Sequence, residues 1–98
     1  MNNYYNKKGE PIEMMKWAEL FEDRDYKMVK QTKLKNKKLV STIWLGLNHE
    51  FGKGEPLIFE TMVFSKKEEF NELDCQRYST LKEAEKGHEE MCKEWENK

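Results

Sequence analysis

Two residues near the centre of the chain could together form a ligand-binding platform. Trp44 offers a large flat ring and Glu60 offers a carboxylate, and each lies in a segment with the pattern of a strand. An aromatic ring stacks on a planar ligand, and a carboxylate among apolar residues is costly to bury unless donor groups satisfy it. Gly46 would let a ligand approach the backbone closely. The chemistry expected here is recognition of a ring that carries hydroxyl or amine donors.

The segment between these two strands contains residue types that suit a phosphate group. Gly52, Lys53 and Gly54 form a tip whose backbone N–H groups and ammonium could face an anion. No helix is expected after this tip, because Pro56 leads into a strand, so the tip is not a Walker motif. The alternative interpretation is a turn whose glycines take positive φ.

The two histidines are the remaining candidates for chemistry. His49 lies in the loop, and His88 lies on the apolar stripe of a C-terminal helix. His88 is either a core histidine bonded to a carbonyl or a site imidazole that reaches toward Glu60 or His49. A small phosphodiesterase built on both histidines is the enzymatic alternative, but no nucleophile elbow or other catalytic arrangement accompanies them. We therefore expect no enzyme, and the predicted ligand-binding residues are Thr42, Trp44, Gly46, Asn48, His49, Gly52, Lys53, Gly54, Glu60, Met62 and His88.

A central hairpin must position most of these groups. Two strands, Val40–Leu47 and Leu57–Phe64, are predicted on either side of the loop Asn48–Pro56. A hairpin symmetric about Gly52 places Trp44 opposite Glu60. That face is either a ligand platform or a packing surface, covered by a helix or a second subunit. The opposite face would be the apolar core face, with Leu39, Ser41, Ile43, Leu45 and Leu47 beside Leu57, Phe59, Thr61 and Val63.

The flanking segments complete an α+β domain. Helical spacing predicts an amphipathic helix from Glu13 to about Asp23, and Asp25–Leu34 has the pattern of an edge strand rich in lysine. Cys75–Ser79 is a short strand candidate, and the capping-box spacing of Thr80-Leu81-Lys82-Glu83 starts a helix that runs to about Trp95. Gly87 within it predicts a close approach to the helix backbone. We expect one domain over residues 1–98, with an antiparallel sheet of three to four strands, a short N-terminal helix and a longer C-terminal helix.

Composition limits the classes of partner. The chain has 98 residues, 37 % hydrophobic and 38 % charged, so a thin aromatic-rich core is expected, completed by a homodimer or higher homo-oligomer or else left as a marginal monomer. The formal net charge of −1 gives no field that selects nucleic acid or a membrane surface. No apolar stretch is long enough to span a bilayer, and the N-terminal residues lack the apolar segment that we would expect in a signal peptide. We expect a protein of the cytosol with reduced cysteines, and no metal or other cofactor.

The sequence also resembles a family of small uncharacterised proteins encoded by phages and prophages. The resemblance covers most of the chain and is strongest in the central run VSTIWLGLNHxFGxGxPLIFETMVF, with similar residues in the N-terminal segment from Tyr5 to Lys27 and in the C-terminal Arg77-Tyr78-Ser79-Thr80 and Gly87-His88. Asn48 stands where the family has an acidic residue before the histidine, which removes one ligand from any metal site at that pair.

A phage origin implies a function that the residues alone do not. Small phage proteins without catalytic motifs often inhibit host defence, and several such families sequester cyclic nucleotide or cyclic ADP-ribose-type signals. The resemblance therefore implies a non-enzymatic inhibitor that acts in the host cytosol and binds a nucleotide-derived signalling molecule. The alternative is an inhibitor that binds a host defence enzyme through a sheet edge or through the lysine-rich hairpin near Lys33, Lys35 and Lys37.

Overall fold

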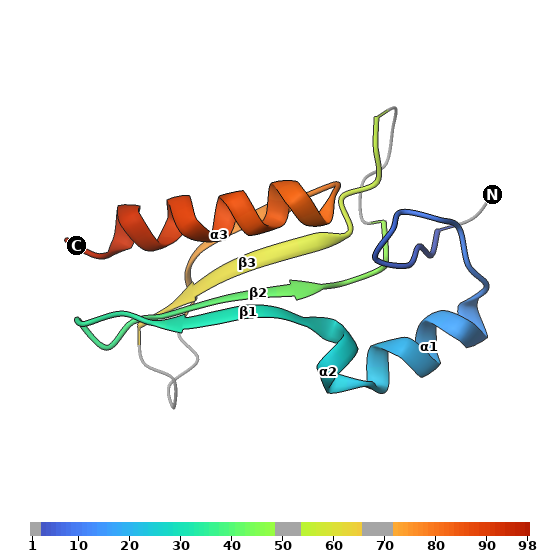
Figure 1. Ribbon diagram of the computed structural model, residues 1–98, viewed down its shortest axis with the longest axis horizontal. Helices are drawn as coiled ribbons and strands as arrows, with labels where there is room; N and C mark the ends of the chain where they lie inside the picture. The colour runs from blue at the N-terminus through green and yellow to red at the C-terminus, as the bar shows by residue number, and fades with distance from the viewer. Residues whose placement is uncertain (1–2, 49–53, 66–71) are drawn as a thin grey trace.

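The computed structural model describes residues 3–48, 54–65 and 72–98 and shows a sheet with one long helix across one face (Figure 1). The sheet is antiparallel and four-stranded, in the order β1-β2-β3-β4. This confirms the predicted α+β class with a short N-terminal and a longer C-terminal helix. The elements are α1 (Met14–Glu22), α2 (Arg24–Lys27), β1 (Met28–Lys33), β2 (Leu39–Trp44), β3 (Phe59–Phe64), β4 (Glu72–Tyr78) and α3 (Leu81–Trp95).

Local sequence signals fix most of the element boundaries. The predicted capping box forms at the start of α3, where the Glu83 N–H donates to Thr80 Oγ1 and the Thr80 N–H donates to Glu83 Oε1. The segment predicted as a strand from Asp25 instead begins with the single turn α2. The Asp23 carboxylate accepts a hydrogen bond from the Tyr26 N–H at 3.2 Å, which caps that turn and delays the strand to Met28.

The register between β2 and β3 is one residue away from the predicted register. Trp44 pairs with Phe59, and Ile43 pairs with Glu60. Because side chains alternate along a strand, Trp44 and Glu60 lie on opposite faces of the sheet. The predicted shared face of Trp44 and Glu60 is therefore wrong, and so is the predicted core face of β2. The face covered by α3 carries Val40, Thr42, Trp44, Phe59, Thr61 and Val63, and the other face carries Leu39, Ser41, Ile43, Glu60, Met62 and Phe64.

A backbone irregularity at Gly46 explains the shift. The N–H groups of Leu45 and Gly46 both donate to the carbonyl of Ile58, at 2.7 and 3.1 Å. Two residues of one strand thus oppose a single residue of its partner, as in a β-bulge, and every pair from Trp44 onward moves by one position. The predicted match of Gly46 with Ile58 holds locally, but it does not extend into the strands.

The core consists of two apolar clusters between the sheet and the helices. Val40, Val63 and Met91 form one cluster under the C-terminal half of α3. The other gathers Trp44 with aromatic residues of the N-terminal segments, which close one end of the sheet (Figure 1). The Tyr26 ring meets the Trp44 ring edge-on, with centroids 4.9 Å apart.

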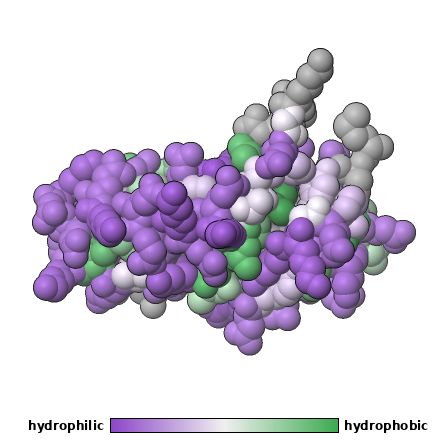
Figure 2. Space-filling model, turned by 45° about the horizontal axis from the view of Figure 1, so that its top comes forward, coloured by the Kyte–Doolittle hydropathy of each residue, from purple (hydrophilic) through white to green (hydrophobic). Residues whose placement is uncertain are grey.

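Hydrophilic residues dominate the face of the molecule shown in Figure 2, and apolar residues form only small areas on it. This agrees with the thin aromatic core expected from composition. Among the helices in the described ranges, none has the length and apolar character needed to cross a bilayer.

Candidate functional site

The predicted platform of Trp44 and Glu60 does not form. Trp44 is fully buried, and its Nε1 donates to the Tyr5 carbonyl at 3.1 Å. Glu60, on the far side of the sheet, is only 7 % exposed and accepts a hydrogen bond from Arg77 Nε at 3.0 Å. The carboxylate is thus satisfied by a side chain of the neighbouring strand β4, on the face of the sheet that α3 does not cover.

Glu60 also changes the chemistry of a thiol on the same face. Cys75 Sγ donates to Glu60 Oε2 at 3.4 Å. Burial, followed by this hydrogen bond and the negative charge of Glu60, raises the pKa of Cys75 to about 11. Both Cys75 and Cys92 are free thiols. A thiol with such a pKa is a weak nucleophile at neutral pH, so Cys75 is not an activated catalytic cysteine.

Gly46 makes room for protein side chains and not for a ligand. A Cβ atom at this position would lie 2.3 Å from Trp44 Cζ2 and 2.8 Å from Trp17 Cδ1, and the backbone has a φ of +68°. Trp17 Nε1 donates to the Leu45 carbonyl at 2.8 Å, which fixes its ring over this bend. The prediction that something approaches Gly46 closely is therefore correct, but the glycine is needed for the bulge and for the packing of two tryptophans and not for a ligand.

The remaining predicted residues are dispersed. Met62 lies on the face with Glu60, and the Asn48 N–H donates to the Asn3 carbonyl at 3.0 Å. Gly54 is exposed, with a φ of +137°. Among the described residues of the predicted set, Thr42 is hydrogen-bonded to His88 and Gly46 lies against the Trp44 ring. Three members of the set, His49, Gly52 and Lys53, lie outside the described residues.

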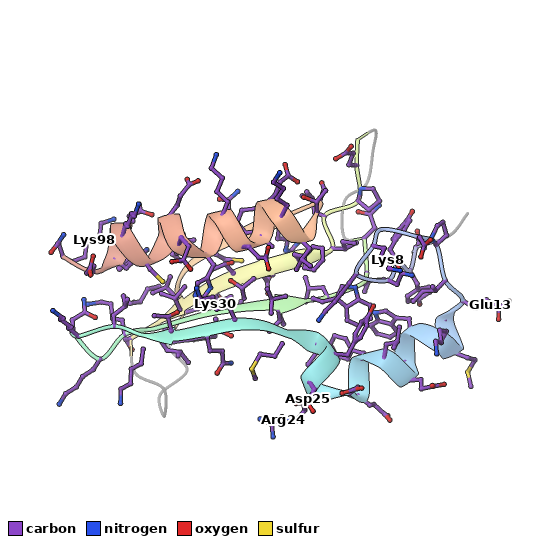
Figure 3. The ribbon with its side chains drawn as sticks, viewed as in Figure 1. Lys8, Glu13, Arg24, Asp25, Lys30 and Lys98 are labelled. Carbon is purple, nitrogen blue, oxygen red and sulfur yellow. The ribbon has the colours of Figure 1, made fainter. Side chains whose placement is uncertain are left out.

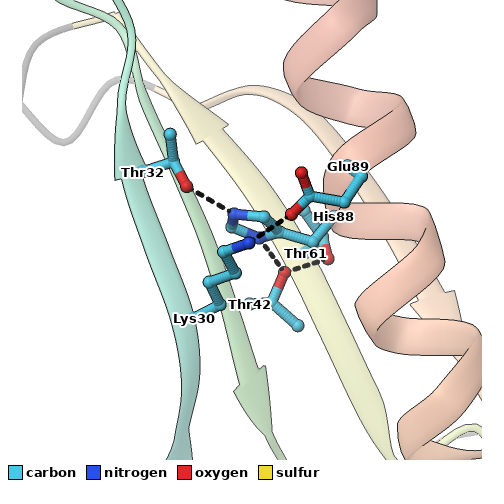
Figure 4. A network of polar contacts seen from close by, with 6 residues as sticks. All are labelled: Lys30, Thr32, Thr42, Thr61, His88 and Glu89. Carbon is cyan, nitrogen blue, oxygen red and sulfur yellow. Dashed lines mark hydrogen bonds and ion pairs between the residues drawn. The ribbon is translucent and has the colours of Figure 1, made fainter.

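His88 forms the centre of a buried network of hydroxyl groups (Figure 4). Its Nδ1 lies 2.6 Å from Thr42 Oγ1 and its Nε2 lies 2.9 Å from Thr32 Oγ1, while Thr42 Oγ1 also contacts Thr61 Oγ1 at 2.5 Å. The ring is fully buried, and burial lowers the pKa of His88. His88 is therefore a neutral core histidine. Its partners are hydroxyls and not the carbonyl that we expected, and Glu60 lies on the far side of the sheet.

An ion pair closes the outer side of this network. Lys30 Nζ on β1 bonds Glu89 Oε2 on α3 (Figure 4). Both side chains are about half exposed, so the pair contributes little to stability. Its position matters more, because it joins the edge strand to the helix beside His88 and limits access of solvent to the ring.

A cavity that sequence reasoning missed lies at the end of the sheet where α3 begins. We call it the N-terminal cavity, and its volume is about 350 Å³. The N-terminal segment Tyr5–Gly9, which includes Lys8 (Figure 3), forms one wall of the cavity. Residues 55–58, before β3, form another wall, and the start of α3 closes the cavity. Its lining residues are Tyr5, Lys7, Lys8, Gly9, Glu55, Pro56, Ile58, Ser79, Thr80 and Leu81.

The sequence contained local signals for single walls of this cavity, including the capping box at Thr80, but none for the meeting of these walls. The turn after Asn6 is visible in the sequence, and the Asn6 carboxamide oxygen accepts from the N–H groups of Lys8 and Glu10. The meeting of this turn with residues 55–58 and 79–81 depends on tertiary packing. Within ranges 3–48, 54–65 and 72–98, no group of three or more His, Cys, Asp or Glu side chains is placed to hold a metal.

Fold and cavity together define a small α+β domain with a lysine-bearing pocket of mixed polar and apolar lining at one end of its sheet. No family model, curated protein or solved structure matches the chain.

Proposed function

We propose that this protein is a non-enzymatic binding protein that holds a small anionic, nucleotide-like molecule in the N-terminal cavity. The observation that supports this proposal is the convergence of two lysines with an apolar wall and a carboxylate. Lys7 and Lys8 suit a phosphate, Tyr5 and Leu81 suit a ring, and Glu55 suits hydroxyl or amine donors. The ligand class is the one expected from the sequence, but the site differs from the predicted platform.

The electrostatics of the cavity favour an anion. Lys7 is partly buried, and burial lowers its pKa against an opposing effect of Asp23. Its ammonium lies 4.6 Å from the centroid of the Tyr26 ring, which does not line the cavity, so Lys8 is the lysine without such a ring contact. At the first turn of α3 the capping box takes the N–H groups of Thr80 and Glu83, which leaves those of Leu81 and Lys82 without an intrahelical partner. A phosphate next to these groups would gain more than it would in open solvent.

Simple binding fits this site better than catalysis. His88 is enclosed by threonine hydroxyls, and the Cys75 thiol has a raised pKa, so neither is poised as a base or a nucleophile. The resemblance to small phage proteins extends the proposal to biology. Binding would sequester a signalling nucleotide of a bacterial antiviral defence in the host cytosol, and a homodimer or higher oligomer would complete the thin core.

Thermal shift against cyclic dinucleotides and cyclic ADP-ribose isomers tests this proposal. We expect at least one of these compounds to raise the melting temperature of the wild type, and the substitution K8E to abolish that rise. K35E is the matched control, because it makes the same charge reversal at an exposed lysine in the turn between β1 and β2. Absence of a shift with every compound would refute the proposal, and so would an equal loss in both variants.

A further inference from the structure

We propose that a second site, the groove between β4 and α3, binds a basic peptide in extended conformation as a fifth strand of the sheet. The groove has a volume of about 510 Å³. Gln76 and Tyr78 of β4 form one side, and a single flank of α3, with Glu83, Glu90 and Glu94, forms the other. This site is separate from the N-terminal cavity and does not depend on the function proposed there.

The free edge of the sheet supplies the backbone contacts. Within the described parts of the chain β4 pairs only with β3, so one row of its backbone N–H and C=O groups is open to a further strand. At the start of β4 this edge is blunted by an irregularity in register and by the Asp74 carboxylate, which accepts from the Cys75 N–H at 2.8 Å. The half of β4 from Gln76 to Tyr78, beside the groove, has the regular pairing that an added strand can extend.

The floor of the groove is apolar and closely packed. Tyr78 lies directly against Gly87, where a Cβ atom would come within 2.2 Å of the tyrosine ring. Met91, 6 % exposed, continues the floor one helical turn further on. A side chain that points from an added strand toward α3 would place its aliphatic part on this floor.

The charge on the rim selects a cationic partner. Three glutamates and one lysine, Lys86, line the helix side of the groove. Glu83 is engaged in the capping box and Glu94 has an exposed partner in Lys98, but Glu90 has neither, and its charge contributes to the raised pKa of Tyr78. Glu83 and Glu94 are eleven positions apart. That separation is about 16 Å along a helix and matches about five residues of strand.

Together these features describe strand addition by a peptide with lysine or arginine at alternate positions. One face of such a strand would direct its cations toward Glu90 and Glu94, and its backbone would pair with β4. An acidic peptide would meet repulsion at the same rim.

Fluorescence anisotropy with the labelled peptide acetyl-KTKVKTK-amide tests this inference on the full chain. We expect saturable binding that weakens with added salt, and loss of binding when alternate backbone nitrogens of the peptide are methylated. The double variant E90Q/E94Q should bind about fivefold more weakly, since exposed ion pairs contribute modestly. The control E85Q/E96Q removes the same charge from helix positions outside the groove and should bind as the wild type does.

Hydrogen exchange distinguishes the addition of a strand to β4 from charge attraction alone. Peptide binding should slow exchange at the backbone amides of Gln76–Tyr78 and leave those of β1 unchanged. The inference is overturned if no binding is seen at millimolar peptide, if the methylated peptide binds equally well, or if both double variants lose the same affinity. Protection on β1 in place of β4 would also overturn it.

Discussion

The hydroxyl of Thr42 on β2 lies 2.6 Å from Nδ1 of His88 on α3, and both side chains are fully buried. This contact fixes how the helix sits on the sheet, because the other ring nitrogen is held by Thr32 of the edge strand. A neutral imidazole can donate from one nitrogen and accept at the other, so two hydroxyls satisfy it. A charged imidazole would have two donors and no route for its charge to water.

The free energy of unfolding should therefore decrease as the pH is lowered through the range where histidine titrates. The folded state lowers the pKa of His88 below the ordinary value of 6.5. As pH falls below 6.5, the unfolded chain takes up a proton that the folded chain does not, and the free energy of unfolding decreases by at most about 1.4 kcal/mol per pH unit. Urea denaturation between pH 7 and about 5.5 measures this effect, because closer to 4.5 the lowered pKa of Glu89 adds a loss of the same sign.

Two variants show which residue causes this dependence of stability on pH. H88Q should be less stable at pH 7 and should lose most of the pH dependence in this range. H49Q removes the other histidine of the chain and should keep the slope. A wild-type stability that is constant or rises as pH falls from 6.5 would contradict the assignment, as would an unchanged slope in H88Q.

The glycine at the bulge should be far less tolerant of a side chain than another glycine with positive φ. G46A adds backbone strain and a clash with Trp44 and Trp17, so we expect a loss of about 2–4 kcal/mol. At Gly9, with a φ of +82° and no atom within 4 Å of the added Cβ, the variant G9A should lose about 1–2 kcal/mol. Chemical denaturation of both variants compares them, and equal losses would mean that the two tryptophans do not enclose Gly46.

A double-mutant cycle tests the contact between Gly87 and Tyr78. In the wild type, G87A should destabilise because its Cβ would meet the tyrosine ring at 2.2 Å. In a Y78A background the clash is gone, and the same substitution should stabilise by up to about 1 kcal/mol through helix propensity. Denaturation of the four proteins gives the coupling. The same sign of effect in both backgrounds would show that the ring does not lie on the helix.

The reactivity of Cys75 reports its link to Glu60. With a pKa of about 11, Cys75 should alkylate slowly with iodoacetamide at pH 9, the ordinary pKa of a thiol. E60Q removes the negative charge and should accelerate the reaction. Mass spectrometry of the C92S protein follows the single remaining thiol. An unchanged or slower rate in E60Q would contradict the hydrogen bond between Cys75 and Glu60.

Local patterns predicted the elements well because their causes are local. The capping box at Thr80 and the helical spacing of Trp17 and Phe21 depend on residues within one or two turns. The close approach at Gly87 was also predicted, although the residue that meets it, Tyr78, was not. The antiparallel pairing of the two central strands, β2 with β3, was predicted correctly, but the order of the outer strands in the sheet was not predicted.

The site was predicted poorly because a shift of one residue in the pairing of β2 with β3 decides which side chains share a face of the sheet. Alternation along β2 was visible, but the double hydrogen bond to the Ile58 carbonyl moves the pairing by one position and sends Glu60 to the other face. The only sequence signal for it was Gly46, which also suits a ligand contact. The N-terminal cavity joins residues far apart in the sequence, such as Lys8 and Thr80, and no spacing rule connects them.

Chemical-shift mapping of the ¹⁵N-labelled protein tests the central claim most directly. On titration with the compound that gives the largest thermal shift, perturbed amides should gather at Tyr5–Gly9, Glu55–Ile58 and Ser79–Leu81, the three walls of the N-terminal cavity. K8E should reduce those perturbations, and K35E should not. Perturbations centred on the sheet face of Glu60 and Met62, or none at saturating compound, would contradict the claim that this cavity is the binding site.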